Sequence, residues 1–218
     1  IDDFCETAST YSELDGQTKM TFSCWINPQS ATTSIIASIK DSGTKEQFRV
    51  MFHGSRYIIV RTHTGNGRDT RTANASITLN TWTHIVFCLD FSLSSGSRGR
   101  IFINGVDATS SDSMNQSSIN TSGGALRIGA RNVSSLLPYP GAIDELAIWS
   151  GTDLRNDVST IYNSGDPNDL NNNGLTAPTT WYRMGDGDTF PTLQDTNGSA
   201  DLTMTNMTSG NIVSDVPT

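Results

Sequence analysis

The stretch TWTHIVFCLDF, residues 81–91, decides the fold class of this 218-residue chain. It is rich in β-branched and aromatic residues and contains neither proline nor glycine, which is typical of a strand. GRIFIN at 99–104 is a second strand, and Asn104-Gly105 at its end is a strong signal for a hairpin turn. Two strong strands in close succession indicate a fold built from β-sheets.

Further strand signals lie on both sides of this pair. The apolar or alternating segments are residues 20–27, 34–40, 47–53, 56–63, 125–129, 142–149, 179–184 and 202–206. Gly54 and Ser55 predict a two-residue hairpin turn between the third and fourth of these segments. Apolar residues recur with helical spacing only in residues 153–163, which predicts one short helix.

The composition supports a β fold and argues against two classes of partner. Lys and Arg total 14 and Asp and Glu total 22, so the net charge is −8. Nucleic acids and anionic membrane surfaces both select basic segments, and we expect neither as a partner. Ser, Thr and Asn together supply 72 residues, whereas only 3 Lys and 4 Glu are present, the residues that usually fill exposed helices.

Cysteine and tryptophan residues mark the expected core. The three cysteines are an odd number, and Cys24 and Cys88 lie inside apolar strands, so we interpret them as buried free thiols. A Cys5–Cys24 or Cys24–Cys88 disulfide is the alternative. Three tryptophans in apolar strands are expected between the sheets: Trp25, Trp82 and Trp149.

Four motifs, in order along the chain, carry a family resemblance. They are FSCWI at 22–26, TWTHIV at 81–86, RIFING at 100–105 and GAIDELAIW at 141–149. Together they resemble the laminin-G-like, or concanavalin A-like, jelly-roll domains, in the branch that includes pentraxins. The resemblance implies an all-β fold, a jelly-roll sandwich of two antiparallel sheets with one short helix.

The C-terminal part extends this resemblance. We expect a single domain over residues 1–218, with residues 166–218 as an extension that packs back on the sandwich. WYRMGD at 181–186 resembles a stretch that precedes the first strand in many family members, although here it follows the closing strand. The end of the chain also resembles the jelly-roll domains of marine phage virion proteins.

Catalysis is not expected, although the fold class includes glycanases and lyases. Retaining glycanases of this architecture use an E-x-D-x-x-E strand, and their chemistry needs two carboxyls about 5–5.5 Å apart. No such strand occurs, and adjacent Asp144 and Glu145 would point to opposite faces of a regular strand. Nucleophile-elbow, P-loop and zinc-protease motifs are absent from the sequence.

Calcium is the one cofactor that the resemblance implies. In the family, the aspartate of the closing strand and a D-x-x-G loop hold a structural calcium ion, whose ligands are hard oxygen donors. The corresponding residues here are Asp144, Asp195, Asn197 and Asp201. Residues 169–174 match the first half of an EF-hand loop, but Thr180 stands where that loop needs Glu, so we interpret them as a surface loop.

An arginine-rich segment supplies the candidate ligand site. Arginine outnumbers lysine by 11 to 3, and five arginines lie between residues 49 and 71. Alternation places Arg49 and His53 on the polar face of their strand, and Tyr57 and Arg61 join them if the next strand pairs in the matching register. Arginine forks suit carboxylates and sugar hydroxyls, so this face predicts contact with an anionic glycan or a partner protein. The alternative is a solvated face with ordinary Arg–Asp pairs.

Three functions remain open from the sequence. The first is a non-enzymatic binding or decoration module on a virion surface, as in a phage capsid or tail-fibre protein. The second is a secreted carbohydrate-binding or adhesion domain of lectin type, and the third is a polysaccharide-active enzyme. The first two imply a glycan or another virion or cell-surface protein as partner, an extracellular or virion-surface location, and room for self-association into a homo-oligomer.

Overall fold

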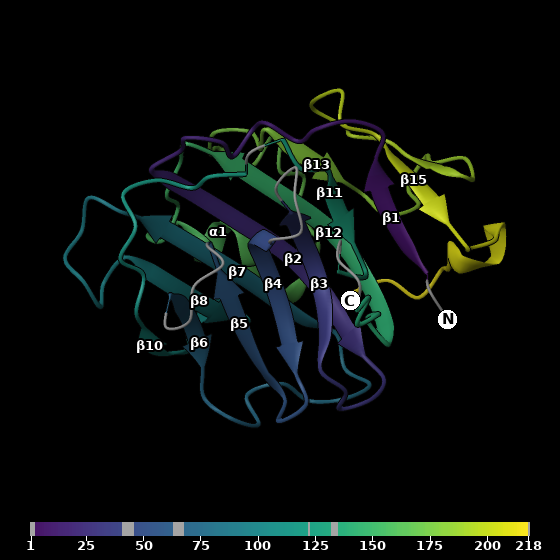
Figure 1. The fold of residues 1–218 in the computed structure, drawn as a ribbon. Helices are drawn as coiled ribbons and strands as arrows, with labels where there is room; N and C mark the ends of the chain where they lie inside the picture. The colour runs from purple at the N-terminus through teal and green to yellow at the C-terminus, as the bar shows by residue number, and fades with distance from the viewer. Residues whose placement is uncertain (1–2, 41–45, 63–67, 122, 132–134, 218) are drawn as a thin grey trace.

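Two antiparallel sheets stacked face to face form the molecule (Figure 1). The computed structural model describes residues 3–40, 46–62, 68–121, 123–131 and 135–217. Within these ranges one sheet has nine strands in the order β10-β6-β5-β4-β3-β11-β1-β15-β14, and the other has six in the order β13-β12-β2-β7-β8-β9. The predicted all-β sandwich with one short helix is confirmed.

The strands have the following bounds. The nine-stranded sheet comprises β1 (Phe4–Thr7), β3 (Ser34–Lys40), β4 (Glu46–His53), β5 (Tyr57–Arg61), β6 (Asp69–Thr72), β10 (Thr109–Asp112), β11 (Leu126–Ile128), β14 (Thr192–Leu193) and β15 (Leu202–Thr205). The six-stranded sheet comprises β2 (Lys19–Pro28), β7 (Thr83–Asp90), β8 (Gly99–Ile103), β9 (Val106–Asp107), β12 (Gly141–Ser150) and β13 (Thr180–Tyr182).

Helical structure is confined to three short segments among the described residues. They are α1 (Val158–Tyr162) and the 3-10 turns η1 (Asn163–Gly165) and η2 (Ser209–Asn211). The predicted helix therefore exists but is shorter than residues 153–163. None of the helices in the described ranges is both long and apolar enough to cross a lipid bilayer.

The main core lies between the sheets and follows the alternation of the strands. The rings of Phe22 on β2 and Phe48 on β4 meet across it, with centroids 6.1 Å apart. The inward residues of these two strands are Met20, Phe22, Cys24, Ile26, Phe48, Val50 and Phe52, all fully buried. Apolar burial of this kind is the main favourable term in folding.

A second apolar cluster covers the outer face of the six-stranded sheet. There α1 and the loop after it lie against β7 and β12. The buried members of the cluster are Val86, Cys88, Ala147, Trp149, Leu154, Val158, Ile161, Leu170 and Trp181. Both faces of this sheet are therefore dry near its centre.

This second cluster corrects the prediction that the tryptophans lie between the sheets. Trp149 is 1% and Trp25 is 5% exposed, but both point outward, because their neighbours on the strand point into the main core. The Trp25 ring lies 4.9 Å from the ring of His84 on β7. Trp82 is only half-buried, and its indole N–H donates to the carboxylate of Asp215 (Nε1–Oδ1 3.3 Å).

The hairpin between β4 and β5 has one more residue than predicted. His53 pairs with Tyr57, so the turn comprises Gly54, Ser55 and Arg56. Arg56 has φ 59°, in the left-handed region, and its N–H donates to the carbonyl of His53 (2.7 Å). Three-residue hairpin loops commonly end with a residue in this conformation.

All three cysteines, Cys5, Cys24 and Cys88, are buried and free. Neither disulfide alternative forms, and the interpretation as buried thiols is confirmed. Cys24 faces the main core and Cys88 faces the second cluster.

The C-terminal part contributes strands to both sheets. β13 pairs with β12 at the edge of the six-stranded sheet, and β15 pairs with both β1 and β14 in the other. Figure 1 shows this yellow segment beside the N-terminal strand, after which the chain turns back toward the sandwich.

Replacing Trp149 by alanine should lower the free energy of unfolding by about 3–5 kcal/mol, the usual cost of emptying a buried aromatic site. The change also removes the indole N–H that donates to the carbonyl of Thr176 (2.7 Å). The same replacement at half-buried Trp82 should cost about 1 kcal/mol or less. Urea unfolding of both variants measures the difference, and equal losses would contradict the assignment of the second cluster.

Candidate functional site

A row of polar side chains crosses the outer face of the nine-stranded sheet. Each member is the cross-strand partner of the next, over six neighbouring strands from β1 to β6. In order the row is Glu6, Arg127, Ser38, Arg49, Arg61 and Asp69. We call these six residues the charge row.

Ion pairs close both ends of the charge row. Arg127 donates to both carboxylate oxygens of Glu6 (Nη2–Oε1 3.1 Å, Nη2–Oε2 3.0 Å), and its guanidinium lies 3.7 Å over the ring of Phe4. Arg61 donates to Asp69 (Nη2–Oδ2 2.9 Å). These are the Arg–carboxylate pairs that the sequence offered as an alternative, but they occupy only the ends.

The centre of the row is different, because Arg49 stands directly opposite Arg61. Like charges at directly opposed positions of an antiparallel pair are destabilising. The Nε atom of Arg61 is buried and has no hydrogen-bond partner among the described residues. An anion that accepts from these guanidinium groups would offset both costs.

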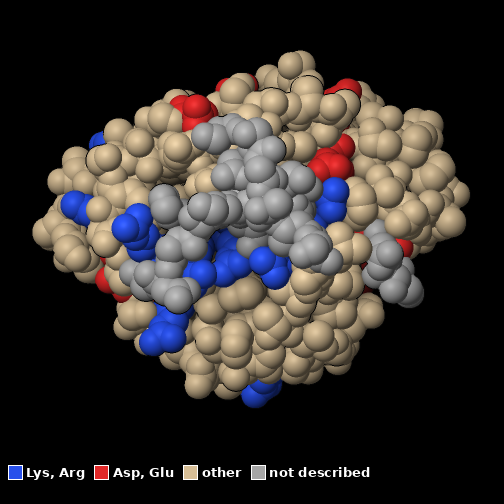
Figure 2. Space-filling model, viewed as in Figure 1, with Lys and Arg blue, Asp and Glu red and all other residues tan. Residues whose placement is uncertain are grey.

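Positive charge is concentrated on this face although the whole chain is acidic. Figure 2 shows the Lys and Arg side chains gathered in a band across the face that Figure 1 presents. Arg71 lies beside the charge row as the partner of Ile59 and donates to Ser111 (Nε–Oγ 3.0 Å). A local basic field in an acidic molecule favours anionic ligands at this face.

At the other end of β4 and β5, the residues on the outer face are aromatic and apolar. His53 is the partner of Tyr57, and their rings stack with centroids 4.4 Å apart and an interplanar angle of 27°. Met51 and Ile59 form the pair between the rings and the arginines. The stacked rings are four residues from the arginine pair, about 13 Å along the strands.

The structure thus brings all four predicted ligand residues onto one face in the matching register: Arg49, His53, Tyr57 and Arg61. Their binding role stays a prediction. Sequence reasoning missed Glu6, Arg127 and Asp69 as members of the same row. Glu6 and Arg127 are 121 positions apart, so no local pattern signals their pairing.

A bulge in β12 overturns the expectation that Asp144 and Glu145 point to opposite faces. The register with β2 shifts between Asp144 and Ala147, and Glu145 has φ 48°, in the left-handed region. Glu145 accepts hydrogen bonds from the indole of Trp181 (Nε1–Oε2 2.7 Å) and from Arg183 (Nε–Oε1 3.3 Å). The two carboxylates are therefore neighbours on the outer side of the strand.

Both carboxyls are 8% exposed and have perturbed pKa values. Burial raises the pKa of Asp144 to about 7, an effect that the negative charge of Glu145 reinforces and a hydrogen bond from the Glu145 N–H opposes. Burial also raises the pKa of Glu145, against the hydrogen bonds from Trp181 and Arg183 that lower it. Asp144 is thus poised to hold a proton near neutral pH.

The remaining residues predicted to bind calcium make hydrogen bonds within their own loop and to neighbouring segments. Asp195 accepts from the N–H groups of Trp181, Asn197 and Ala200. Asp201 accepts from the N–H of Asp195 (2.9 Å). Asn197 exchanges hydrogen bonds with Asn171, which lies in the 169–174 stretch interpreted as a surface loop (2.8 Å each).

These residues do not fit a calcium ion. Asp144 lies beside Glu145 rather than in the network of Asp195 and Asp201. Among the residues that the structure describes, no three His, Cys, Asp or Glu side chains group as metal ligands. Ca²⁺ requires about 6–8 oxygen donors around one point, which this arrangement does not supply.

Comparison of the sequence with known families gives one match. The family model described as concanavalin A-like lectin/glucanases superfamily matches residues 2–159. No curated protein sequence matches the chain. Because the family match ends before the last 59 residues, it lends no support to the resemblance of the chain's end to phage virion proteins.

Solved structures share the fold at low identity. The native heptameric SAP-like pentraxin from Limulus polyphemus is 17% identical, with a TM-score of 0.59 over 73% of this chain and 75% of that chain. The CBM40 of Ruminococcus gnavus IT-sialidase is 10% identical, with 0.54 over 72% and 93%. Domain 4 of the extracellular arabinanase AbnA from Geobacillus stearothermophilus, solved with arabinotriose, is 20% identical, with 0.50 over 69% of each. At these identities the matches show the fold alone.

Replacing Asp144 by asparagine should remove a pH dependence of stability. Between the unfolded pKa of about 3.9 and the folded pKa of about 7, the native state holds a proton that the unfolded chain has lost, so wild-type stability falls as pH rises. The asparagine variant lacks this fall. At pH 8 it should be more stable than wild type by about 1–4 kcal/mol, and near pH 4 the two should be equal.

Urea unfolding at both pH values measures this difference. Asp107→Asn is the matched control, because Asp107 is exposed on β9 and should show no such pH-dependent gain. The assignment would be contradicted if the Asp144→Asn variant lost as much stability between pH 4 and pH 8 as wild type does.

Removing divalent ions should leave the melting temperature unchanged, because the Asp195 and Asp201 carboxylates already serve the loop backbone. A bound ion at about 100 times its Kd would contribute about 2.7 kcal/mol, and its loss would lower Tm by about 5–11 °C. Melting curves with calcium and with excess EGTA distinguish these outcomes. A fall in Tm of that size would support the calcium site that the sequence predicted.

Proposed function

This chain belongs to the concanavalin A-like lectin/glucanases superfamily, and from that membership we propose that it is a non-catalytic glycan-binding domain. The fold supports this proposal, because the arabinanase domain with which it shares architecture was solved with an oligosaccharide. The Asp144 and Glu145 carboxylates also support a non-catalytic role. Glu145 is occupied by Trp181 and Arg183, and the Asp144–Glu145 pair is nearly inaccessible to a substrate.

The outer face of the nine-stranded sheet is the proposed binding surface. The observation that carries this proposal is the direct opposition of Arg49 and Arg61 at the centre of the charge row. Both guanidinium groups lie on the outer face of the sheet, and that of Arg61 also pairs with Asp69 at 2.9 Å. A carboxylate or sulfate on a sugar accepts from such groups through charge-assisted hydrogen bonds, which are stronger than neutral ones.

The rest of the face suits a short acidic oligosaccharide rather than a single sugar. One end of the two strands is charged, and the other carries the stacked rings of His53 and Tyr57, about 13 Å away. Sugar rings present apolar C–H faces that pack on aromatic and aliphatic side chains. An acidic sugar at Arg49 and Arg61 would then place its neighbours over the partly exposed side chains of Met51 and His53.

A domain of this kind acts where glycans are exposed. We therefore place it in an extracellular setting, on a cell surface or a virion, with a glycan or a surface protein as partner. The extracellular arabinanase among the structural neighbours supports such a setting. Self-association belongs to the same proposal, since the pentraxin neighbour is heptameric, and light scattering measures it directly.

The Arg49→Ala, Arg61→Ala double variant should lose binding to acidic glycans. An array of acidic and neutral oligosaccharides identifies a ligand, and calorimetry then compares a uronic-acid oligosaccharide with its carboxyl-reduced form. Each lost charge-assisted contact is worth about 1.5–3 kcal/mol, so we expect the affinity to fall at least about 100-fold. Wild type should bind the reduced form equally weakly.

Arg100→Ala is the matched control, because Arg100 lies on β8 of the other sheet, where it pairs with Asp107 at 3.7 Å and donates to the carbonyls of Gly96 and Gly99. It should keep the wild-type affinity. If the double variant remains folded and binds within twofold of wild type, the sheet face is not the site, and the loops at the sandwich ends replace it. Turnover of any polysaccharide on the panel would overturn the non-catalytic assignment.

A further inference from the structure

A cavity of about 660 Å³ lies between the two sheets at the end where the C-terminal segment crosses. β1 and β15 form one wall, β12 forms another, and residues 210–216 also line the cavity. The charge row does not line it, because the cavity is on the inner side of the nine-stranded sheet. It is therefore separate from the proposed glycan surface.

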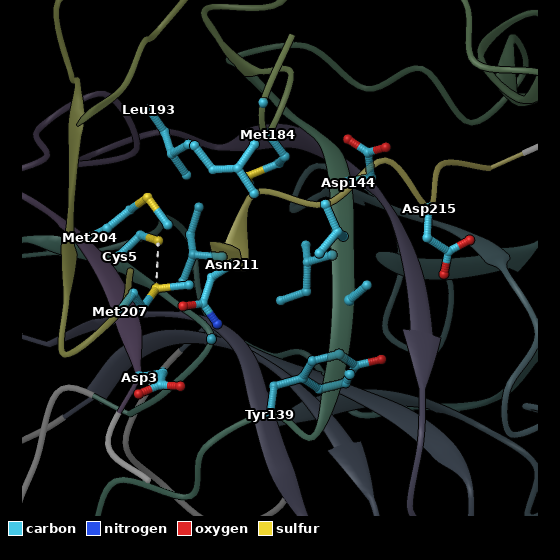
Figure 3. Close-up of a pocket in the computed structure, with 18 of the residues that line it drawn as sticks. Asp3, Cys5, Tyr139, Asp144, Met184, Leu193, Met204, Met207, Asn211 and Asp215 are labelled. Atoms are coloured by element: carbon cyan, nitrogen blue, oxygen red, sulfur yellow. Dashed lines mark hydrogen bonds between the residues drawn. The ribbon is translucent and has the colours of Figure 1, made fainter. Parts of the chain in front are cut away.

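Sulfur atoms gather on the β1–β15 wall of this cavity. Cys5 on β1 is the direct cross-strand partner of Met204 on β15, so their side chains adjoin on the same face. The Cys5 thiol donates to the thioether of Met207, with Sγ and Sδ 3.8 Å apart. Figure 3 shows Cys5 between Met204 and Met207, with the dashed line marking the contact to Met207.

The spacing of the Cys5 and Met207 sulfurs matches that of two ligands on one ion. Metal–sulfur bonds are about 2.3 Å long, so two sulfurs bound at tetrahedral or trigonal angles lie about 3.8–4.0 Å apart. The observed Sγ–Sδ separation of 3.8 Å falls in this range. Thiolate and thioether ligands select soft ions, and Cu(I) is the first-row ion that prefers such a set.

We propose that Cys5, Met204 and Met207 form a binding site for a single Cu(I) ion. On binding, the Cys5 thiol releases its proton to solvent and the thiolate coordinates the ion, while the two thioethers bind without change of charge. No group is oxidised or reduced. The cavity gives the ion access, and its lining combines apolar side chains with charged ones such as Asp3 and Arg183.

Packing alone is the competing explanation, since methionine commonly fills irregular gaps in cores. Met114 illustrates that role: it is fully buried, and its thioether accepts a hydrogen bond from the hydroxyl of Thr62 (3.3 Å). Met207, in contrast, is only half-buried and follows the last strand, yet its sulfur contacts the Cys5 thiol. The chain thus contains its own control for a thioether outside the proposed site.

The test is anaerobic titration of the full chain with the Cu(I)–bicinchoninate complex. Wild type should withdraw one equivalent of Cu(I) and gain a thiolate-to-metal charge-transfer absorption in the near ultraviolet. Cys5→Ser should lose this absorption and the binding. Met204→Leu and Met207→Leu should each weaken binding by at least the about 10–100-fold that loss of a supporting residue costs at metal sites.

Matched controls separate the site from the other sulfurs. Met114→Leu and Cys88→Ala should bind like wild type, and circular dichroism confirms that each variant is folded. If Cys5→Ser fails to fold, the two methionine variants decide, because leucine preserves volume in an apolar wall. Failure of wild type to compete for Cu(I), or retention of full affinity in both methionine variants, would overturn the proposal.

Discussion

Burial of β2 on both faces is the constraint on which the rest of the structure depends. Its inward residues pack against β4, and its outward residues lie under α1 and the second cluster. Polar groups on the outward side must therefore bond internally. Ser23 bonds to His84 (Oγ–Nε2 2.8 Å), and burial lowers the pKa of His84 to about 3, which keeps its ring neutral. The outer face of the six-stranded sheet is therefore covered at its centre, and the proposed ligand surface lies on the nine-stranded sheet.

The charge row follows from this difference between the outer faces of the two sheets. On the nine-stranded sheet, alternation sends apolar residues inward and leaves every second position for polar side chains. Ion pairs join Glu6 to Arg127 and Arg61 to Asp69 at the two ends, and Arg49 stands directly opposite Arg61 at the centre. The direct opposition of two arginines at the centre is the feature on which the proposed binding surface rests.

The sequence predicted the long strands and their order because apolar alternation is a local signal. It placed Arg49 and His53 on one face, and Tyr57 and Arg61 join them because the turn has three residues rather than the predicted two, which pairs His53 with Tyr57. β6 and β10 were missed because their sequences, DTRT and TSSD, have no alternation of apolar residues. They form strands by pairing with each other. The bulge at Glu145 was also missed, since a left-handed non-glycine residue leaves no compositional mark.

The pairing of β1 with β15 links the two proposed sites. Adjacent residues of a strand point to opposite faces, so Glu6 turns outward to end the charge row while Cys5 turns inward to the sulfur cluster. β15 supports both, because Thr203 is the partner of Glu6 and Met204 is the partner of Cys5. The C-terminal segment is itself anchored by Glu145, which holds Trp181 on β13 against β12. The late strands therefore do more than close the sandwich: they set the position of β1, and through it the geometry of both faces.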